Sequence, residues 1–268
     1  MSILTVENLS LRFGGTHALT GVDFEVTEGE LFAVIGPNGA GKTSIFNCLS
    51  GVYRPQEGSI TLAGTPLLGL RPDAIARRGV ARMFQNIELF DNLTVLDNIK
   101  LGRHIHLRYS TFEAALFLGR ARRAELAARR FAEGLIEFLE LESVRHHPVG
   151  MLPYGIKKRV ELARALAMEP SLLLLDEPVA GMNVEETEDM ARFLCDIRSE
   201  MGISMIMVEH DMRLVMDLAD RIMVLDFGKR IALGTPEQVR RDPAVIAAYL
   251  GGADTDSAAE AEALLESR

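Results

Sequence analysis

The chain has 268 residues, of which 48% are hydrophobic, so it is long enough and apolar enough for one sizeable domain with its own core. Its formal net charge of −9 disfavours broad nucleic-acid binding and direct attraction to anionic lipid, because both need a basic surface. The longest uninterrupted run of large aliphatic side chains, Leu172 to Leu175, is far shorter than the roughly 18–20 residues of a membrane span.

Residues 1–11 lack the basic start and the long apolar stretch of a secretory signal, so we expect a cytosolic protein. The two cysteines, Cys48 and Cys195, are far apart and fit no metal-ligand spacing. In a reducing compartment we expect both to be small buried side chains.

Alternating and β-branched residues predict strands in the first part of the chain, around glycine-rich turns. In chain order, the predicted elements are two strands within 3–26 around the Gly14–Gly15 turn, a strand at 31–35, a helix at 42–49, a strand at 59–63 and a short helix within 66–78.

The composition then changes. From about residue 96 to 149 the chain is rich in Ala, Arg, Leu and Glu, and it has no strand pattern. Phe131, Leu135, Phe138 and Leu139 recur at helical spacing, which predicts an amphipathic helical segment. We interpret this segment as a helical insertion in an otherwise alternating α/β chain.

The α/β pattern resumes after the insertion with short, continuously apolar runs that are typical of parallel strands covered on both faces. The predicted elements are helices at 156–167 and 184–201, strands at 172–175, 203–208, 222–225 and 231–233, a capping box at Thr235–Gln238 and a last helix from Asp242-Pro243 to Gly251. We expect the small, acidic tail 253–268 to be disordered.

A phosphate-binding motif lies between the strand at 31–35 and the helix at 42–49. Its sequence, Gly-Pro-Asn-Gly-Ala-Gly-Lys-Thr at 36–43, fits G-x-x-x-x-G-K-[ST]. Backbone N–H groups of such a loop and the helix N-terminus bind phosphate. We expect Lys42 to reach the β and γ phosphates and Thr43 to bind Mg²⁺. The predicted nucleotide-contacting residues here are Gly36, Asn38, Gly39, Ala40, Gly41, Lys42, Thr43 and Ser44.

Two carboxylates follow the buried run Leu172 to Leu175. Asp176 and Glu177 stand where a parallel sheet binds its ligands, at the carboxyl end of a strand. We predict that Asp176 holds Mg²⁺, directly or through water, and that Glu177 polarises the attacking water.

With these motifs placed, the chain closely resembles an ABC transporter nucleotide-binding subunit from about residue 4 to 250. The resemblance implies a P-loop ATPase fold in the α/β class, with a mostly parallel sheet, an N-terminal antiparallel β part and an inserted helical subdomain. It places one ATPase domain at 1–252, with the helical subdomain at about 92–168.

Three further site residues are implied by the resemblance. Phe13, in Leu-Arg-Phe-Gly-Gly, stands where the family has an aromatic residue that stacks on adenine. Gln85, in Arg-Met-Phe-Gln-Asn, matches the glutamine that approaches Mg²⁺ and water and links the site to the membrane subunit. His210, in Met-Val-Glu-His-Asp-Met, matches the histidine that contacts the γ-phosphate.

The segment Leu152-Pro-Tyr-Gly-Ile stands at the family's Leu-Ser-Gly-Gly-Gln signature, which contacts the nucleotide of the opposite subunit. Gly155 is kept, whereas Pro153, Tyr154 and Ile156 depart from the pattern. Asn183 replaces the usual Asp of the family's D-loop. These departures leave open how well this signature serves its composite site.

Within the family, the chain is most similar to ATPases that take up branched-chain, hydrophobic amino acids. That resemblance implies ATP and Mg²⁺, two transmembrane permeases, a second ATPase subunit, and indirectly an extracytoplasmic binding protein, with this chain peripheral on the cytoplasmic face of the membrane. A heterodimer is favoured by the altered signature, and a homodimer stays open.

Three alternatives remain. The chain could serve another ABC system, such as lipopolysaccharide export or uptake of a different small solute. A soluble ABC ATPase of ribosomes or DNA is disfavoured because such proteins carry two ATPase domains or a long coiled coil. A regulator without turnover is disfavoured by the intact Lys42, Thr43, Asp176, Glu177 and His210.

Overall fold

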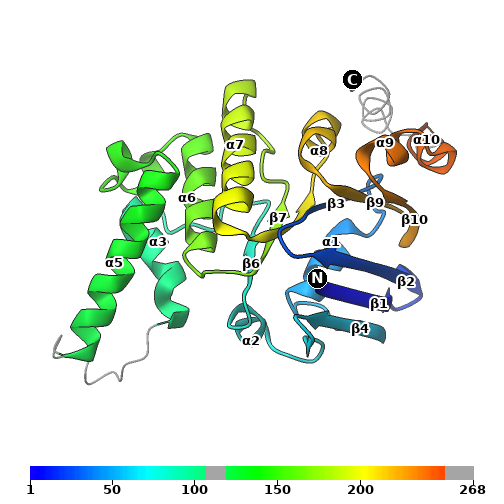
Figure 1. Ribbon diagram of the computed structural model, residues 1–268, viewed down its shortest axis with the longest axis horizontal. Helices are drawn as coiled ribbons and strands as arrows, with labels where there is room; N and C mark the ends of the chain where they lie inside the picture. The colour runs from blue at the N-terminus through cyan, green and yellow to red at the C-terminus, as the bar shows by residue number, and fades with distance from the viewer. Residues whose placement is uncertain (107–118, 251–268) are drawn as a thin grey trace.

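The computed structural model describes residues 1–106 and 119–250, which form two sheets flanked by helices (Figure 1). The larger sheet has the strand order β10-β9-β3-β8-β7-β6. All its neighbouring strands are parallel except β10, which runs antiparallel to β9, so the predicted mostly parallel sheet is confirmed. Its strands are β3 (Leu31–Ile35), β6 (Val80–Met83), β7 (Leu172–Asp176), β8 (Ser204–Val208), β9 (Arg221–Asp226) and β10 (Lys229–Gly234).

The smaller sheet is antiparallel and comes from the N-terminal part of the chain, as predicted. Its order is β2-β1-β4-β5, with β1 at Ser2–Phe13, β2 at Thr16–Thr27, β4 at Glu57–Leu62 and β5 at Thr65–Pro66. Along β2, buried Val22, Phe24 and Val26 alternate with exposed residues, because successive side chains of a strand point to opposite faces.

Helix α1 (Lys42–Leu49) belongs to the core that joins the two sheets, where its Ile45, Phe46 and Leu49 pack with residues of both. The other face of the larger sheet packs on the remaining large helices. We call the core between the two sheets the first core, and the core between the larger sheet and these helices the second core. In β7, Leu172 and Leu174 belong to the first core and Leu173 and Leu175 to the second. A strand covered on both faces needs apolar residues at every position, which explains its continuous leucine run.

The predicted helical insertion leaves the larger sheet after β6 and returns at β7. It is the group of helices at the left of Figure 1. On α5, Leu135 is buried and Phe131 and Phe138 are partly buried against the second core, as their spacing predicted. The helices and 3-10 turns here are α3 (Val95–Gly102), η1 (Arg103–His106), α5 (Arg120–Phe138), η2 (Glu142–Val144), η3 (Val149–Met151) and α6 (Tyr154–Leu166).

The remaining helices are α2 (Pro72–Ala76), α7 (Val184–Met201), α8 (Met212–Leu218), α9 (Pro236–Arg240) and α10 (Pro243–Leu250). Sequence analysis missed β6 and α8, because Arg82 interrupts the apolar run of β6 and the seven residues of α8 are too few for a helical period to stand out. Helix α6 also begins two residues earlier than predicted, at Tyr154. None of the helices in the described ranges is both long enough and apolar enough to cross a bilayer.

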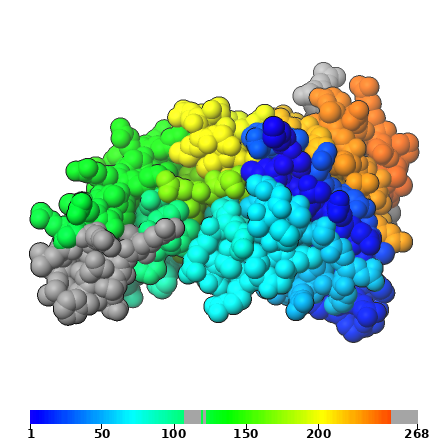
Figure 2. All heavy atoms as spheres, turned by 60° about the horizontal axis from the view of Figure 1, so that its bottom comes forward, coloured from blue at the N-terminus to red at the C-terminus, as the bar shows by residue number. Residues whose placement is uncertain are grey.

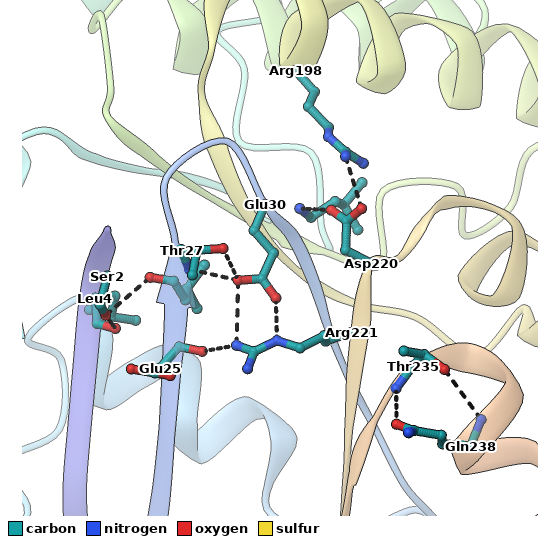
Figure 3. Close-up of polar contacts among 12 residues, drawn as sticks. Ser2, Leu4, Glu25, Thr27, Glu30, Arg198, Asp220, Arg221, Thr235 and Gln238 are labelled. Carbon is teal, nitrogen blue, oxygen red and sulfur yellow. Dashed lines mark hydrogen bonds and ion pairs between the residues drawn. The ribbon is translucent and has the colours of Figure 1, made fainter.

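Polar contacts join the two sheets at the turn before β3 (Figure 3). Glu30 is 5% exposed; its carboxylate accepts hydrogen bonds from Thr27 and forms an ion pair with Arg221 of β9, with Nε 2.7 Å from Oε1. Arg221 also donates to the backbone oxygen of Glu25 in β2. The same figure shows the confirmed capping box of α9, in which Thr235 and Gln238 bond each other's backbone N–H.

On the face shown in Figure 2, the light-blue and cyan segment that includes β4, α2 and β6 lies between the N-terminal strands and the helices of the insertion. The chain thus passes from the antiparallel sheet to the insertion through β6, and the residue that follows β6 begins the connection that carries Gln85. The predicted tail 253–268 lies outside the described residues.

The expectation that both cysteines are buried is wrong for one of them. Cys48 is buried in α1, whereas Cys195 is exposed on α7. Helix α7 is amphipathic: its buried residues include Phe193, Leu194 and Ile197, and position 195 falls on the solvent side. Composition alone could not assign a face to a single cysteine.

We predict that a thiol reagent at pH 8 labels one cysteine of the native protein and two after denaturation. Burial raises the pKa of the Cys48 thiol from 9.0 to about 12, so very little reactive thiolate is present, and the side chain is also shielded. Mass spectrometry of the labelled chain checks the count. The Cys195→Ser variant should lose the native label, and rapid native labelling of Cys48 would contradict the packing of α1.

Candidate functional site

The loop between β3 and α1 is held so tightly that only glycine fits at two of its positions. A Cβ atom on Gly36 would lie 2.1 Å from the backbone oxygen of Leu225, and one on Gly41 would lie 2.7 Å from that of Ala18. Both residues also have positive φ, at 147° and 107°. The loop is therefore clamped between β9 and β2, with the N-terminus of α1 directly behind it.

Lys42, the first residue of α1, folds back over this loop. Its ammonium donates to the backbone oxygens of Gly36, at 2.5 Å, and Pro37, at 3.2 Å, and the residue is buried. These bonds hold the positive charge at the loop, where the phosphates of a nucleotide would arrive.

A pocket of about 320 Å³ opens over the loop. Of the sequence-predicted site residues, those that line it are Asn38, Gly39, Ala40, Gly41, Lys42, Thr43, Ser44, Glu177 and His210. Sequence analysis missed three lining residues, Thr16, His17 and Ala18. They begin β2 directly after the Gly14–Gly15 turn, and only the packing of β2 against Gly41 brings them here.

Three predicted catalytic side chains from separate loops meet beside this pocket. The amide nitrogen of Gln85 donates to Glu177 Oε2 at 2.7 Å, and His210 Nε2 lies 3.3 Å from Glu177 Oε1. They follow β6, β7 and β8, so the carboxyl ends of three neighbouring parallel strands bring them together.

The backbone of Glu177 is held in an uncommon conformation. Its φ is 49°, in the left-handed region that residues other than glycine rarely adopt, and its N–H donates to the oxygen of Val208 at 2.9 Å. Such conformations persist where the surroundings fix them, and they are frequent at functional sites. Here the constraint comes from the end of β8.

Asp176, the predicted metal ligand, is buried and already bears one strong contact. Its Oδ2 lies 2.5 Å from Arg82 Nη2 of β6, and Arg82 Nη1 donates to Asn47 of α1 at 2.8 Å. Arg82 was missed by sequence analysis, although an arginine among the apolar residues just before Gln85 was a signal. It ties the β6, β7 and α1 parts of the site together.

The residues present fit a Mg²⁺ ion, because the hydroxyl of Thr43, the carboxylate of Asp176 and the amide oxygen of Gln85 are hard oxygen donors. Thr43 is exposed toward the pocket. The described ranges contain no group of three or more His, Cys, Asp and Glu that could enclose a metal by itself. A metal here would therefore depend on phosphate oxygens for part of its coordination, as Mg²⁺ usually does.

Glu209 is a second buried carboxylate that sequence analysis missed. Its Oε1 accepts from Val179 N–H at 3.0 Å and its Oε2 from His210 N–H at 2.9 Å. Burial raises the pKa of Glu209, and these backbone hydrogen bonds oppose that shift. Glu209 thus joins the turn that follows Glu177 to the loop that carries His210.

Two predicted nucleotide contacts lie away from this pocket. Phe13 ends β1, is 49% exposed and packs edge-on against Tyr53 at 5.0 Å between ring centroids, and it is not among the pocket-lining residues. Gly155 is in the first turn of α6, where the carboxylate of Glu186 packs so closely that a Cβ atom would lie 2.3 Å from it. Asn183 caps α7 in a capping box with Glu186.

A larger hollow of about 780 Å³ lies on the outside of the insertion, along α5 and η2. Its walls include arginine and glutamate side chains that pair with one another, such as Arg145 with Glu133 at 3.2 Å. It contains none of the motif residues, so the smaller pocket over the loop is the candidate site.

Comparisons with known proteins identify the family to which the chain is similar. The family described as "ABC transporter" matches residues 19–180, and "Branched-chain amino acid ATP-binding cassette transporter" matches residues 229–255. The chain is 44% identical over 252 residues to "High-affinity branched-chain amino acid transport ATP-binding protein BraF" of Pseudomonas aeruginosa, which covers 94% of this chain and 98% of the relative. It is 41% identical over 251 residues to the LivG protein of the same description from Escherichia coli strain K12, with the same coverage.

Solved structures match as well. A nucleotide-free ATP-binding cassette from an ABC transporter superposes with a TM-score of 0.81 at 29% identity, covering 94% of this chain and all of that one. The ADP conformation of an ATP-binding cassette of an ABC transporter gives 0.80 at 29% identity, with the same coverage. A dimeric bacterial ABC transporter cassette gives 0.73 at 25% identity, covering 87% of this chain and 98% of that one.

Proposed function

The chain belongs to the ABC transporter family as an ATP-hydrolysing subunit, and on that premise we propose that it powers the import of branched-chain, hydrophobic amino acids. The observation that carries the ATPase chemistry is the meeting of Gln85, Glu177 and His210 beside the pocket over the phosphate-binding loop. The amino-acid substrate is supported by the similarity along nearly the whole chain to ATP-binding proteins of branched-chain amino acid transport, and by the C-terminal family match.

In this proposal the phosphates of ATP lie on the loop from Gly36 to Ser44, where backbone N–H groups and Lys42 neutralise their charge. Adenine stacks on the exposed face of Phe13. Mg²⁺, held by Thr43, Asp176 and Gln85, would neutralise charge on the phosphate oxygens. Since Gln85 uses its amide nitrogen on Glu177, its amide oxygen can face the metal.

Glu177 and His210 then act on the two partners of the reaction. The carboxylate of Glu177, fixed by Gln85 and His210, orients a water molecule and accepts a hydrogen bond from it for in-line attack on the γ-phosphorus. The ring of His210 contacts the γ-phosphate. His210 is held for this role by Glu209, which bonds its backbone N–H.

The proposed working unit contains a second ATPase subunit, whose nucleotide meets Gly155 of this chain. The position of Gly155 supports this arrangement, because Gly155 does not line the pocket of its own chain. The second subunit is a different ATPase or another copy of this one. Two permeases, with a binding protein on the far side of the membrane, complete the system, and this chain sits at the cytoplasmic face. No nucleic acid is involved.

The test is uptake of labelled leucine by the native host, compared among wild type, a strain that lacks this chain, and that strain complemented with wild-type or Lys42→Ala protein. We predict that uptake falls in the deletion strain and returns only with the wild-type protein, because Lys42→Ala removes the charge that the phosphate loop holds. Immunoblotting checks that both complementing proteins are present.

Unchanged leucine uptake in all strains, in a host without a redundant carrier, would contradict the amino-acid substrate. The ATPase assignment would survive that result. The next substrates to test would be other small solutes, followed by export components such as lipopolysaccharide.

A further inference from the structure

The connection that carries Gln85 is held by helix α6, the helix that begins at the signature segment. We define the Gln85 loop as residues 84–93, which lie between β6 and α3 and form no helix or strand. Lys158, Glu161 and Arg164 recur every three residues on α6 and therefore share one face. Lys158 Nζ donates to the backbone oxygens of Gln85, at 2.8 Å, and Phe84, at 3.3 Å, and Arg164 donates to that of Glu88.

The complete burial of Lys158 is unusual for a lysine. Its side chain is 0% exposed, and Glu161 Oε2 is 4.0 Å away. Burial lowers the pKa of Lys158, which the charge of Glu161 opposes. Replacing such a buried charged pair by apolar residues of similar volume is often neutral or stabilising, so fold stability gives little reason for a lysine here.

The other end of the Gln85 loop is anchored independently. Asn98 of α3 is fully buried; its Oδ1 accepts from Phe90 N–H at 2.9 Å and its amide donates to the Phe90 oxygen at 3.1 Å. The end near Phe90 is thus fixed by α3. At the end near Gln85, Lys158 of α6 donates to the backbone oxygen of Gln85.

We propose that Lys158 is a positioning residue that fixes the backbone of Gln85 so that its amide reaches Glu177, and that this links the first turn of α6 to the hydrolysis site of the same subunit. The link is short. Lys158 lies one turn after Tyr154, and its Nζ is 6.0 Å from the centre of the Tyr154 ring. Gln85 accepts a hydrogen bond from Lys158 at its backbone oxygen and donates one to Glu177 from its side-chain amide. Movement of the signature segment, whose Gly155 faces the other subunit's nucleotide in the proposed function, is thereby passed to Glu177.

This inference rests on the proposed roles of Gln85 and Glu177. If Lys158 acts through Gln85, Lys158 has no effect on kcat once the Gln85 side chain is removed. Replacing Lys158 in a protein that already lacks the Gln85 side chain should therefore lower kcat no further. A residue that merely supports the fold would lower activity by the same factor whether or not Gln85 is present.

The experiment is a double-mutant cycle on the purified full chain with Lys158→Met, Gln85→Ala and both together. We expect Lys158→Met to lower kcat for ATP hydrolysis by about 10- to 100-fold while KM and the Kd of a fluorescent ATP analogue change less than about threefold. The double variant should have a kcat within about twofold of the slower single variant.

Two further variants serve as a control and as a replacement. Lys157→Met removes a neighbouring half-buried lysine that donates to the Gly150 oxygen, outside the Gln85 loop, and should keep wild-type kcat. If Lys158→Met does not fold, as judged by its melting curve, Lys158→Met/Glu161→Leu replaces it, because that pair leaves no unpaired buried charge.

Three outcomes would overturn the inference. In the first, the Lys158 variant is folded and its kcat is unchanged. In the second, kcat of the double variant falls by the product of the factors measured for Lys158→Met and Gln85→Ala alone. Either result, with an active wild type, leaves the proposed function intact. In the third, the wild-type chain hydrolyses no ATP, which overturns the proposed function and this inference together.

Discussion

Replacing Glu177 by Gln is expected to lower kcat for ATP hydrolysis by about 10²- to 10³-fold. The amide has almost the same shape as the carboxylate, so packing at the end of β7 is kept, but it cannot supply the negative charge that orients and polarises water. We expect the Kd for ATP to stay within about threefold of wild type, because in the proposed function the loop and Lys42 bind the phosphates.

The measurement is the steady-state release of phosphate together with nucleotide binding by fluorescence. Glu188→Gln is the matched control: it makes the same chemical change on the same chain at an exposed position of α7, and it should hydrolyse ATP at the wild-type rate. A Glu177→Gln protein as fast as wild type would remove Glu177 from the mechanism, and the water would need another partner.

The second large expected effect is on the stability of the fold, at the contact between α3 and α6. Gly102 is the last residue of α3 and packs directly on the backbone of α6. A Cβ atom there would lie 2.2 Å from the backbone oxygen of Arg164 and 2.9 Å from Ala167 Cβ. Since a backbone oxygen in a helix cannot move aside alone, Gly102→Ala must push the two helices apart. We expect it to lower the free energy of unfolding by about 2–3 kcal/mol, as overpacking does.

Urea unfolding followed by circular dichroism measures this change. Gly134→Ala is the control, because Gly134 lies within α5 with no atom within 4 Å of an added Cβ. Alanine is the better helix former, so this variant should gain about 0.5–1 kcal/mol. Equal stability of Gly102→Ala and wild type would mean that α3 and α6 approach less closely than described.

The two glycines show why sequence analysis stops short of packing. Gly102 and Gly134 both stand in the part of the chain that is predicted to be helical, and their sequence neighbours do not reveal what packs against them. The expected effects of alanine on stability are opposite, because Gly102 packs against the backbone of α6 whereas no atom lies within 4 Å of a Cβ on Gly134. The residues beside each glycine in the sequence do not show this difference.

The same limit applies to the site. Glu177 was predicted from the buried strand before it, and Gln85 and His210 were implied by the family resemblance of their motifs, but the contact among the three depends on β6, β7 and β8 being adjacent in the sheet. Arg82, Lys158 and Glu209 were missed because their importance comes from burial and from partners far along the chain.

The local features of this protein can be predicted from its residues alone: a phosphate-binding motif between a strand and a helix, an acidic pair after a buried strand, and the apolar runs that predict a parallel sheet. These features follow from short-range rules, since backbone conformation, strand alternation and helix capping depend on nearby residues. Three contacts appear first in the tertiary structure: the Gln85 amide bonds Glu177, Arg82 pairs with Asp176, and buried Lys158 bonds the Gln85 backbone. They join residues 73 to 94 positions apart, and they arise from the order of strands in the sheet for the first two and from the packing of α6 for the third.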